Sequence, residues 1–347
     1  MGGKVLNIGV IGCGYWGPNL LRNFYNIDES KVITCSDLKE KRLRHMKSLY
    51  PSVETTENYK DIINNDEIEA VVIATPVSSH YQISKEALEA GKHVFVEKPL
   101  ASSVREGTEL VEMARKKGLV LFVGHTFVYT AAVNKIKELI NSGELGEIYY
   151  ITSSRLNLGL FQDDINVMWD LAPHDISIMN YILDSSPESV TANGYSYIQP
   201  EIDDVGFITL RYPGSVVANI HVSWLNPNKI RKTTVVGSKK MLVYDDVSSL
   251  EKIRIYDKGV DVVPHYDTFG EFQLSYRYGD ISIPKLNDEE PLKVECQHFI
   301  NCVKHGETPR SSGEDGLDIM LALDAAGRSI ADGCRQVEIE YPELFKE

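Results

Sequence analysis

Three glycines near the amino end of the chain restrict its possible folds more than any other feature. The apolar run from Val5 to Ile11 leads directly into Gly12-x-Gly14-x-x-Gly17. The first glycine permits a tight turn from strand to helix, the second lets the backbone approach a pyrophosphate, and the third lets the helix pack closely on the strand. Phosphates would bind the N–H groups at the start of that helix. The pattern predicts a dinucleotide site, and an ordinary glycine-rich turn is the alternative.

The second apolar run ends on a carboxylate that strengthens this interpretation. Asp37 closes the segment that begins at Lys31 and lies twenty residues after Gly17. A carboxylate at that spacing can bind both ribose hydroxyls and would repel a 2′-phosphate, which favours NAD over NADP. The alternative is that Asp37 caps the helix expected over residues 39–50. Lys39 and Lys41 lie near enough to leave NADP open.

Size and composition limit the class of protein. A chain of 347 residues with 43% hydrophobic residues predicts two globular domains. A formal net charge of −14 argues against nucleic acid or an anionic membrane as a partner. The five cysteines show no CxxC spacing, and the start of the chain has no long apolar segment after a basic region. We therefore expect no disulfide framework, no metal site and a cytoplasmic location.

The order of apolar and polar segments predicts the fold class. Up to Gly124 they alternate at βαβ spacing, which indicates an N-terminal Rossmann domain with a doubly wound parallel sheet. The strands expected after Asp37 are 70–74, 93–97 and 120–124, and the helices are 39–50, 79–90 and 103–117.

Beyond Gly124 the pattern changes to longer alternating segments, which predict an α+β domain with a large, open, mostly antiparallel sheet. The expected strands are 148–156, 189–197, 204–212, 215–223, 232–236 and 240–244, with a hairpin turn at 212–215. The expected helices are 132–142, 171–183, 293–305 and 316–330, the last three covering the sheet. We place the boundary near Thr126, giving domains 1–126 and 127–347.

Two segments carry polar groups that suit oxidation of an alcohol. Lys98 follows the strand 93–97, and ligands bind at the carboxyl ends of strands in such sheets. Its amine can donate a hydrogen bond or help deprotonate a hydroxyl, whereas a surface lysine beside Pro99 is the alternative. A histidine titrates near neutral pH, so His174 can accept a hydroxyl proton. Asp170, four residues earlier, could orient that imidazole or offset the charge of Lys98. A helix cap at Asp170 and a hydrogen-bonded core histidine are the alternatives.

Together these motifs resemble the glucose-fructose oxidoreductase, inositol dehydrogenase and MocA family, abbreviated Gfo/Idh/MocA. The resemblance is carried by the glycine turn, Ala74-Thr-Pro76 with His80, Glu97-Lys98-Pro99, Val123-Gly124 and the segment 298–317. It implies an enzyme, an NAD-dependent sugar dehydrogenase, with a cis Lys98-Pro99 bond and His174, Asp170 and Lys98 as catalytic residues. It also implies cofactor contacts from Gly12, Gly14, Tyr15, Trp16, Gly17, Asp37, Thr75, Pro76, His80, Glu97 and Lys98, with no metal.

Within this family, the residues 153–157 and 169–175 look most like the branch that oxidises nucleotide-linked amino sugars at the third ring carbon. That likeness implies oxidation of the 3-hydroxyl of a UDP-N-acetylhexosamine, or its uronate, to a 3-keto sugar. Arg155 could hold a diphosphate or a carboxylate of the substrate, or could form a surface ion pair instead. The expected substrate contacts are Lys98, Tyr129, Arg155, Asn157, Asp170 and His174.

Two other functions stay open at this point. One is a dehydrogenase of a free polyol or monosaccharide, and the other is a non-catalytic sensor of a dinucleotide or sugar. An open sheet leaves one face to be covered, so we expect a homo-oligomer, and the family resemblance points to a dimer or tetramer.

Overall fold

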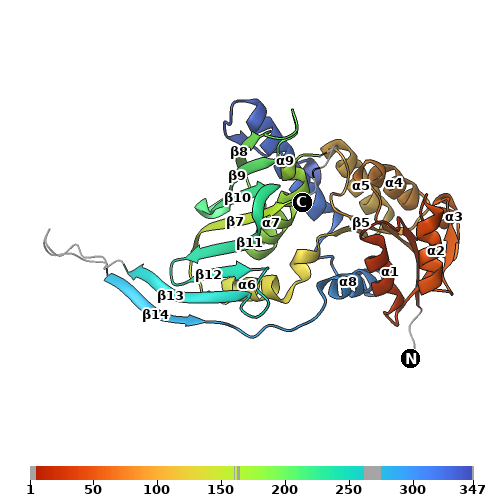
Figure 1. Ribbon diagram of the computed structural model, residues 1–347, viewed down its shortest axis with the longest axis horizontal. Coiled ribbons are helices and arrows are strands. Elements are labelled where there is room, and N and C mark those ends of the chain that lie inside the picture. The colour runs from red at the N-terminus through yellow and green to blue at the C-terminus, as the bar shows by residue number, and fades with distance from the viewer. Residues whose placement is uncertain (1–4, 160, 162–164, 262–274, 346–347) are drawn as a thin grey trace, which may run out of the picture. The chain divides into compact units, whose positions relative to one another are not determined.

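The computed structural model describes residues 5–159, 161, 165–261 and 275–345, which form two compact units (Figure 1). The first unit comprises residues 1–130, 289–321 and 341–347, and the second comprises residues 131–288 and 322–340. The break after Thr130 lies close to the boundary expected near Thr126. The structure departs from the expected contiguous second domain, because two later segments return to the first unit.

The first unit is built on a six-stranded parallel sheet in the order β3-β2-β1-β4-β5-β6. Its strands are β1 (Leu6–Ile11), β2 (Ser30–Ser36), β3 (Glu54–Thr56), β4 (Ala70–Ile73), β5 (His93–Glu97) and β6 (Leu121–Gly124). This arrangement confirms the predicted Rossmann sheet. Strand β3 was not predicted, since its three residues are too few and too exposed to form a periodic pattern.

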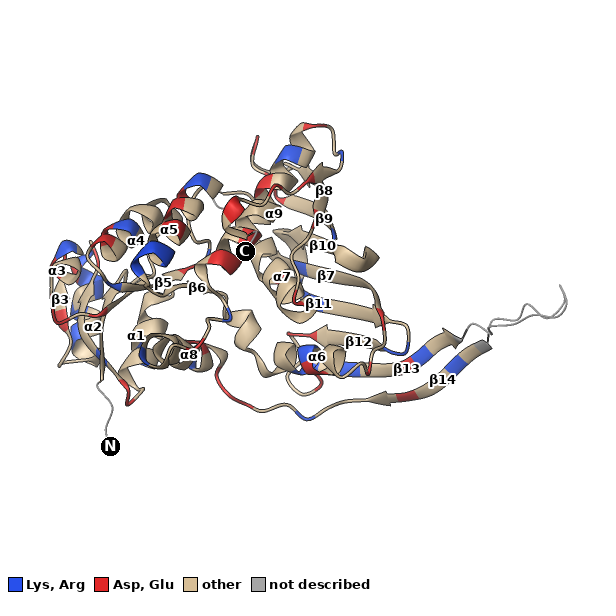
Figure 2. Cartoon of the chain, turned by 180° about the vertical axis from the view of Figure 1, so that it is seen from behind, with Lys and Arg blue, Asp and Glu red and all other residues tan. Residues whose placement is uncertain are grey.

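Helices flank this sheet on both faces. They are α1 (Gly17–Tyr25), α2 (Glu40–Leu49), α3 (Lys60–Ile63), α4 (His80–Glu89), α5 (Val104–Lys117) and α8 (Pro291–His305). Ser103 caps α5 by accepting a hydrogen bond from Glu106 N–H, and Gly118 ends it in the left-handed conformation. Figure 2 shows charges of both signs on α4 and α5, where Lys85 pairs with Glu109 at 2.6 Å.

A cluster of aromatic rings explains why α8 belongs to the first unit. The ring of Phe299 on α8 lies 5.5–6.0 Å from the rings of Phe24, Phe95 and Phe122, centroid to centroid. Edge-to-face contacts of this kind stabilise a core beyond the area they bury. The expectation that residues 293–305 cover the second sheet is therefore corrected.

The second unit holds a nine-stranded sheet in the order β14-β13-β12-β11-β7-β10-β9-β8-β15. The strands are β7 (Ile148–Leu158), β8 (Ser189–Tyr195), β9 (Val205–Arg211), β10 (Val217–Ser223), β11 (Leu225–Gly237), β12 (Met241–Asp245), β13 (Ile253–Asp261), β14 (Ser275–Ser282) and β15 (Val337–Glu338). Strands β7 and β10 pair in parallel and the other pairs are antiparallel, as predicted for a mostly antiparallel sheet. The turn Pro213–Ser215 joins β9 to β10, as expected.

The two faces of this sheet differ in burial. Ile208, Leu210 and Ile220 are fully buried and alternate along their strands with more exposed residues. Helix α7 (Val167–Leu183) contacts β7, β9 and β10, and α6 (Ala131–Asn141) contacts α7. The chain passes from the first unit to the second within α9 (Gly313–Ala331). In the part of the chain that the structure describes, each helix is too short or too polar to cross a bilayer.

Candidate functional site

The glycine turn has the geometry that its three glycines require. Gly12 has φ of +96°, and a Cβ there would lie 2.5 Å from the carbonyl oxygen of Ala74. A Cβ on Gly17 would lie 1.8 Å from the oxygen of Gly12, so α1 packs directly on the turn. Apart from its chain neighbours, a Cβ on Gly14 would have one atom of the described residues within 4 Å, Nη1 of Arg42 at 3.8 Å. Contacts within the protein therefore require glycine at positions 12 and 17. At position 14 a side chain would instead enter open space beside the turn.

That space is a pocket of about 680 Å³ along the carboxyl edge of the parallel sheet. Its lining residues include Gly12 after β1, Asp37 after β2, Thr75 after β4 and Lys98 after β5. Of the other residues expected to contact a cofactor, the lining also includes Gly14, Tyr15, Trp16, Pro76 and Glu97. The structure thus brings residues from four strand ends to one pocket, which is where open α/β sheets bind their ligands.

Asp37 connects the glycine turn to the start of α2. One of its carboxylate oxygens accepts a hydrogen bond from Cys13 N–H and the other from Lys39 N–H, both at 2.8 Å. Nη1 of Arg42 lies 3.1 Å from Oδ2 of the same carboxylate. Sequence reasoning missed Arg42, although its position in the first turn of the helix after Asp37 could have indicated the pair. Asp37 therefore has both a ligand-facing position and a structural role near the helix start.

His80 has a different role from the cofactor contact expected for it. Its ring is buried, and its nitrogens lie 2.8 Å from the carbonyl oxygen of Pro99 and 2.9 Å from that of Thr75. Burial lowers the pKa of His80, against the two carbonyls that raise it. A neutral ring donates to one of these carbonyls, since it carries one N–H. His80 therefore packs between the segments of Thr75 and Pro99 and hydrogen-bonds one of them, and it is not among the residues that line the pocket.

Lys98 stands at the end of β5 as expected. Its side chain lines the pocket, and the peptide bond between Lys98 and Pro99 is cis. Glu97 is buried beside it, and burial raises the pKa of Glu97 to about 7 despite the opposing charge of Lys98. The pocket therefore ends on an amine and a carboxyl group.

Tyr129 lies in the core of the first unit and does not offer its side chain to a substrate. It is 2% exposed, and its ring stacks on Phe122 with centroids 6.0 Å apart. The hydroxyl lies 3.0 Å from Ser311 Oγ, and burial raises the pKa of Tyr129 well above its usual value. The expectation that Tyr129 contacts the substrate is thus corrected, because its side chain packs inside the first unit, against the segment 289–321.

Helix α7 in the second unit carries the other expected catalytic pair. The helix begins at Val167, four residues earlier than predicted, because Asn166 caps it by accepting from Met168 and Trp169 N–H at 3.1 Å. Asp170 is therefore not the N-cap, and its carboxylate accepts from the indole of Trp224 at 3.1 Å. His174 follows one turn later. Asp170 and His174 share one side of the helix, as expected from their spacing.

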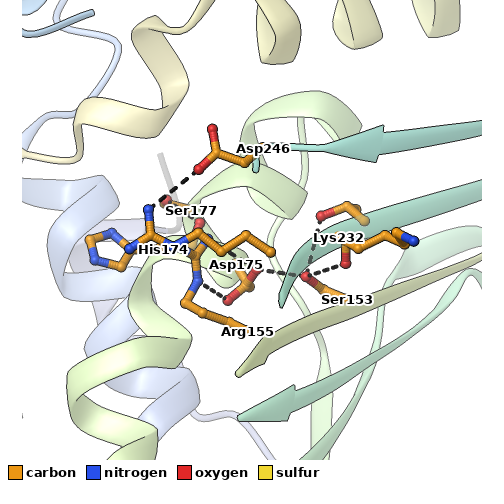
Figure 3. A network of polar contacts seen from close by, with 9 residues as sticks. Ser153, Arg155, His174, Asp175, Ser177, Lys232 and Asp246 are labelled. Atoms are coloured by element: carbon orange, nitrogen blue, oxygen red, sulfur yellow. Dashed lines mark hydrogen bonds and ion pairs between the residues drawn. The ribbon is translucent and has the colours of Figure 1, made fainter. Parts of the chain in front are cut away.

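Arg155 is engaged by a neighbouring carboxylate. Its Nε lies 2.7 Å from Asp175 Oδ2 and its Nη2 lies 3.3 Å from Oδ1, with side chains 5% and 2% exposed (Figure 3). Ser153 Oγ donates to the same carboxylate at 2.6 Å. Both earlier interpretations of Arg155 are corrected, because its guanidinium is neither on the surface nor open to a diphosphate. Asn157 lies farther along β7 and is half-buried.

The structure places the expected site residues in two groups. The first unit carries the pocket with the glycine turn, Asp37 and Lys98, and the second carries Asp170 and His174 on α7. Across the described residues, no three His, Cys, Asp or Glu side chains are arranged to hold a metal ion.

A parallel sheet in the order β3-β2-β1-β4-β5-β6, with a glycine turn after β1 and an acid after β2, defines a Rossmann dinucleotide-binding domain. Residues 6–125 match the oxidoreductase family with an NAD-binding Rossmann fold, and residues 133–243 match the GFO/IDH/MocA C-terminal domain. The chain belongs to the Gfo/Idh/MocA family of oxidoreductases.

Relatives and solved structures cover nearly the whole chain. A myo-inositol 2-dehydrogenase from Thermotoga maritima is 27% identical over 96% of this chain and 99% of its own. The UDP-N-acetylglucosamine 3-dehydrogenase GnnA from Acidithiobacillus ferrooxidans has a TM-score of 0.78 at 22% identity, covering 94% of this chain and 98% of its own. The WlbA dehydrogenase from Bordetella pertussis, in complex with NADH and UDP-GlcNAcA, has a TM-score of 0.81 at 20% identity, covering 98% and 100%. These structural similarities are similarities of fold.

Proposed function

We propose that the protein is an NAD-dependent dehydrogenase that oxidises a ring hydroxyl of a sugar to a ketone. The proposal depends chiefly on one observation: Lys98 lines the same pocket as the glycine turn and Asp37. A dinucleotide bound along this pocket would have its adenosine ribose on Asp37 and its phosphates at Gly14. The nicotinamide end would then lie toward Lys98, beside a group able to bind the reacting hydroxyl.

The chain's own residues take separate roles in this reaction. The cofactor, when bound, supplies the hydride acceptor. The Lys98 amine binds the hydroxyl oxygen and stabilises the negative charge that develops on it. His174 accepts the hydroxyl proton, and the Asp170 carboxylate, held by the Trp224 indole, orients the imidazole.

Replacement of each group tests these roles. Lys98→Ala and His174→Ala should each lower turnover by about 10²-fold or more, the usual range for a positioned acid, base or charge. Both variants should still bind NADH. Full turnover in either variant would contradict its assigned role. Tight NAD binding without turnover of any sugar by the unaltered protein would instead favour the non-catalytic sensor.

For the cofactor, we propose NAD rather than NADP. The Asp37 carboxylate can accept hydrogen bonds from ribose hydroxyls and would repel a 2′-phosphate. Arg42 opposes this preference, because its guanidinium lies at the same carboxylate and suits a phosphate. Asp37→Ala should therefore shift the ratio of NADH to NADPH affinity toward NADPH. Tighter binding of NADPH than NADH by the unaltered protein would contradict the proposal.

For the substrate, we propose a UDP-N-acetylhexosamine or its uronate, oxidised at the 3-hydroxyl. The proposal is supported by the likeness of residues 153–157 and 169–175 to that branch. It is also supported by the fold shared with one protein named for such a sugar and another solved in complex with one. The second candidate is a free cyclitol or monosaccharide. It is favoured by the inositol dehydrogenase relative and by the engagement of Arg155 with Asp175.

A substrate panel separates the two candidates. NADH absorbance is followed with UDP-N-acetylglucosamine, its uronate, myo-inositol and glucose, each at equal concentration. We expect turnover with the UDP-sugars. Reaction with the unlinked compounds alone would overturn the nucleotide-sugar assignment and leave the dehydrogenase assignment intact.

We also propose that the protein forms a homo-oligomer through the outer face of the second sheet. Phe207 on β9 is 38% exposed, and its ring stacks on His221 of β10 with centroids 4.3 Å apart. Tyr150 and Tyr195 are each 46% exposed on neighbouring parts of the sheet. Exposed apolar surface of this kind favours association. Light scattering should give a dimer or tetramer, and a stable monomer would contradict the proposal.

A further inference from the structure

Glu97 occupies an unusual place at the end of the pocket. It pairs in register with Gly124 of the neighbouring strand. A Cβ on Gly124 would lie 3.1 Å from both Cδ and Oε2 of Glu97, so the carboxyl group lies over the bare backbone of that glycine. The side chain also lines the pocket beside Lys98. Glu97 is therefore a buried carboxyl group that borders the space for a ligand.

Further buried polar groups lie near it in the same unit. Glu295 on α8 is fully buried, and its Oε2 accepts a hydrogen bond from Thr126 Oγ1 at 2.7 Å. Its Oε1 and both ring nitrogens of the buried His125 have no hydrogen-bond partner among the residues that the structure describes. Buried polar atoms without protein partners commonly mark a functional cluster or internal water.

The charge state of each group follows from its surroundings. Burial, then the charge of Glu97, raises the pKa of Glu295 well above its usual value. Burial, then the charge of Lys98, lowers the pKa of His125 to about 3. Burial first, then Glu295 and Glu97, raises the pKa of the adjacent Cys296 thiol. The shifts of His125 and Cys296 keep both groups neutral near pH 7, and the raised pKa of Glu295 favours its neutral form. Glu97, with a pKa raised to about 7, changes its charge there.

The position of Glu97 matters because the two forms of the cofactor differ in charge. The oxidised nicotinamide ring carries a positive charge and the reduced ring is neutral. A dinucleotide with its ribose on Asp37 and its phosphates at Gly14 would have this ring toward Glu97 and Lys98. A positive ring favours an ionised carboxylate nearby, whereas a neutral ring does so much less.

We propose that Glu97 couples binding of the oxidised cofactor to release of one proton, so that the pocket distinguishes NAD⁺ from NADH in a pH-dependent way. This inference rests on the proposed NAD-linked function. Because the bound cation stabilises ionised Glu97, affinity for NAD⁺ rises as the pH rises through the neutral range. Affinity for NADH stays nearly constant. Near neutral pH, Glu97 thus makes the oxidised and reduced complexes differ in their proton content.

The test measures dissociation constants of NAD⁺ and NADH for the full chain between pH 6 and pH 8, by calorimetry without substrate. If only the ionised form binds NAD⁺, a group that titrates at about 7 weakens binding by about tenfold from pH 8 to pH 6. NADH affinity should change by less than about twofold over the same range. NAD is used rather than NADP, since a 2′-phosphate itself titrates near pH 6.

Two isosteric variants supply the control. Glu97→Gln should make NAD⁺ affinity independent of pH, because an amide does not titrate there. Glu295→Gln removes a neighbouring buried carboxyl group whose raised pKa favours the neutral form, so the pH dependence should remain. Pairs of buffers with different ionisation enthalpies should also show release of about half a proton per NAD⁺ at pH 7 by the unaltered protein. This last measurement needs no variant to fold.

Each contrary outcome has a distinct meaning. Binding of NAD⁺ without pH dependence or proton release in the unaltered protein overturns the role of Glu97 and leaves the dehydrogenase proposal standing. A pH dependence that survives Glu97→Gln assigns the proton to another group and overturns the inference. Failure to bind either cofactor at every pH overturns the proposed function itself.

Discussion

Loss of the Asp175 carboxylate should strongly destabilise the second unit. Asp175 pairs with Arg155 through two contacts and accepts from Ser153, and both members of the ion pair are at least 95% buried by side-chain area. Removing one partner of such a pair leaves an uncompensated charge in the core. Asp175→Ala should therefore lower the free energy of unfolding by about 3–5 kcal/mol. In Figure 3 the pair joins α7 to β7, so the loss should affect this unit first.

Urea unfolding followed by tryptophan fluorescence can measure this effect. Two of the three tryptophans, Trp169 and Trp224, lie in the second unit, so a Trp16→Phe background reports on that unit. Replacing both partners with apolar residues of similar size, Arg155→Met with Asp175→Leu, should recover stability to within about 2 kcal/mol of the parent, because no charge is then left unpaired.

A surface pair in the same unit provides the control. Lys135 and Glu138 lie 2.7 Å apart on α6, with Glu138 66% exposed by side-chain area. Glu138→Ala should change stability by less than about 1 kcal/mol, since solvent screens exposed pairs. The reasoning would be refuted if Asp175→Ala cost no more than Glu138→Ala.

Three further changes test other parts of the account. Gly14→Val should fold normally but lose about 10²-fold in NADH affinity, because its side chain enters the pocket and not the protein core; unchanged affinity would contradict this. Tyr129→Phe should lower the free energy of unfolding by about 1 kcal/mol, measured by thermal unfolding, because the hydrogen bond to Ser311 is lost, and NADH binding should be unaffected. Weakened NADH binding would show that Tyr129 does contribute to the ligand site. His80→Ala should destabilise the protein by about 1–2 kcal/mol, because the carbonyl that accepts from the ring loses its donor, and should weaken NADH binding indirectly through the segments of Thr75 and Pro99. Stability equal to the parent's would show that this hydrogen bond contributes nothing.

The features predicted well from the sequence are those set by local chemistry. The turn at Gly12 needs positive φ, and the βαβ spacing determines that Asp37 and Lys98 follow strands of one parallel sheet. Side chains at the carboxyl ends of such strands meet at one edge. The residues Gly14, Asp37 and Lys98 of the pocket could therefore be predicted from the sequence.

The features that sequence reasoning missed depend on contacts between distant segments. The return of α8 to the first unit depends on Phe299 meeting aromatic rings from three other elements. Tyr129 and Arg155 were expected to contact the substrate, yet both are buried, Tyr129 beside Ser311 and Arg155 in an ion pair with Asp175. Helix α7 begins earlier than predicted because Asn166, which precedes the segment 169–175, accepts hydrogen bonds from the first N–H groups of the helix. The spacing of apolar residues within one segment does not indicate which distant residues will contact it.

The most direct test of the central claim is a rapid-mixing measurement of NADH formation from a sugar deuterated at the carbon to be oxidised. Enzyme and NAD⁺ are mixed with UDP-N-acetylglucosamine, either unlabelled or deuterated at carbon 3. We expect one NADH per sugar oxidised and slower formation of NADH from the deuterated sugar. Absence of NADH with this sugar, its uronate and every unlinked polyol, from protein that binds NAD⁺, would contradict this expectation.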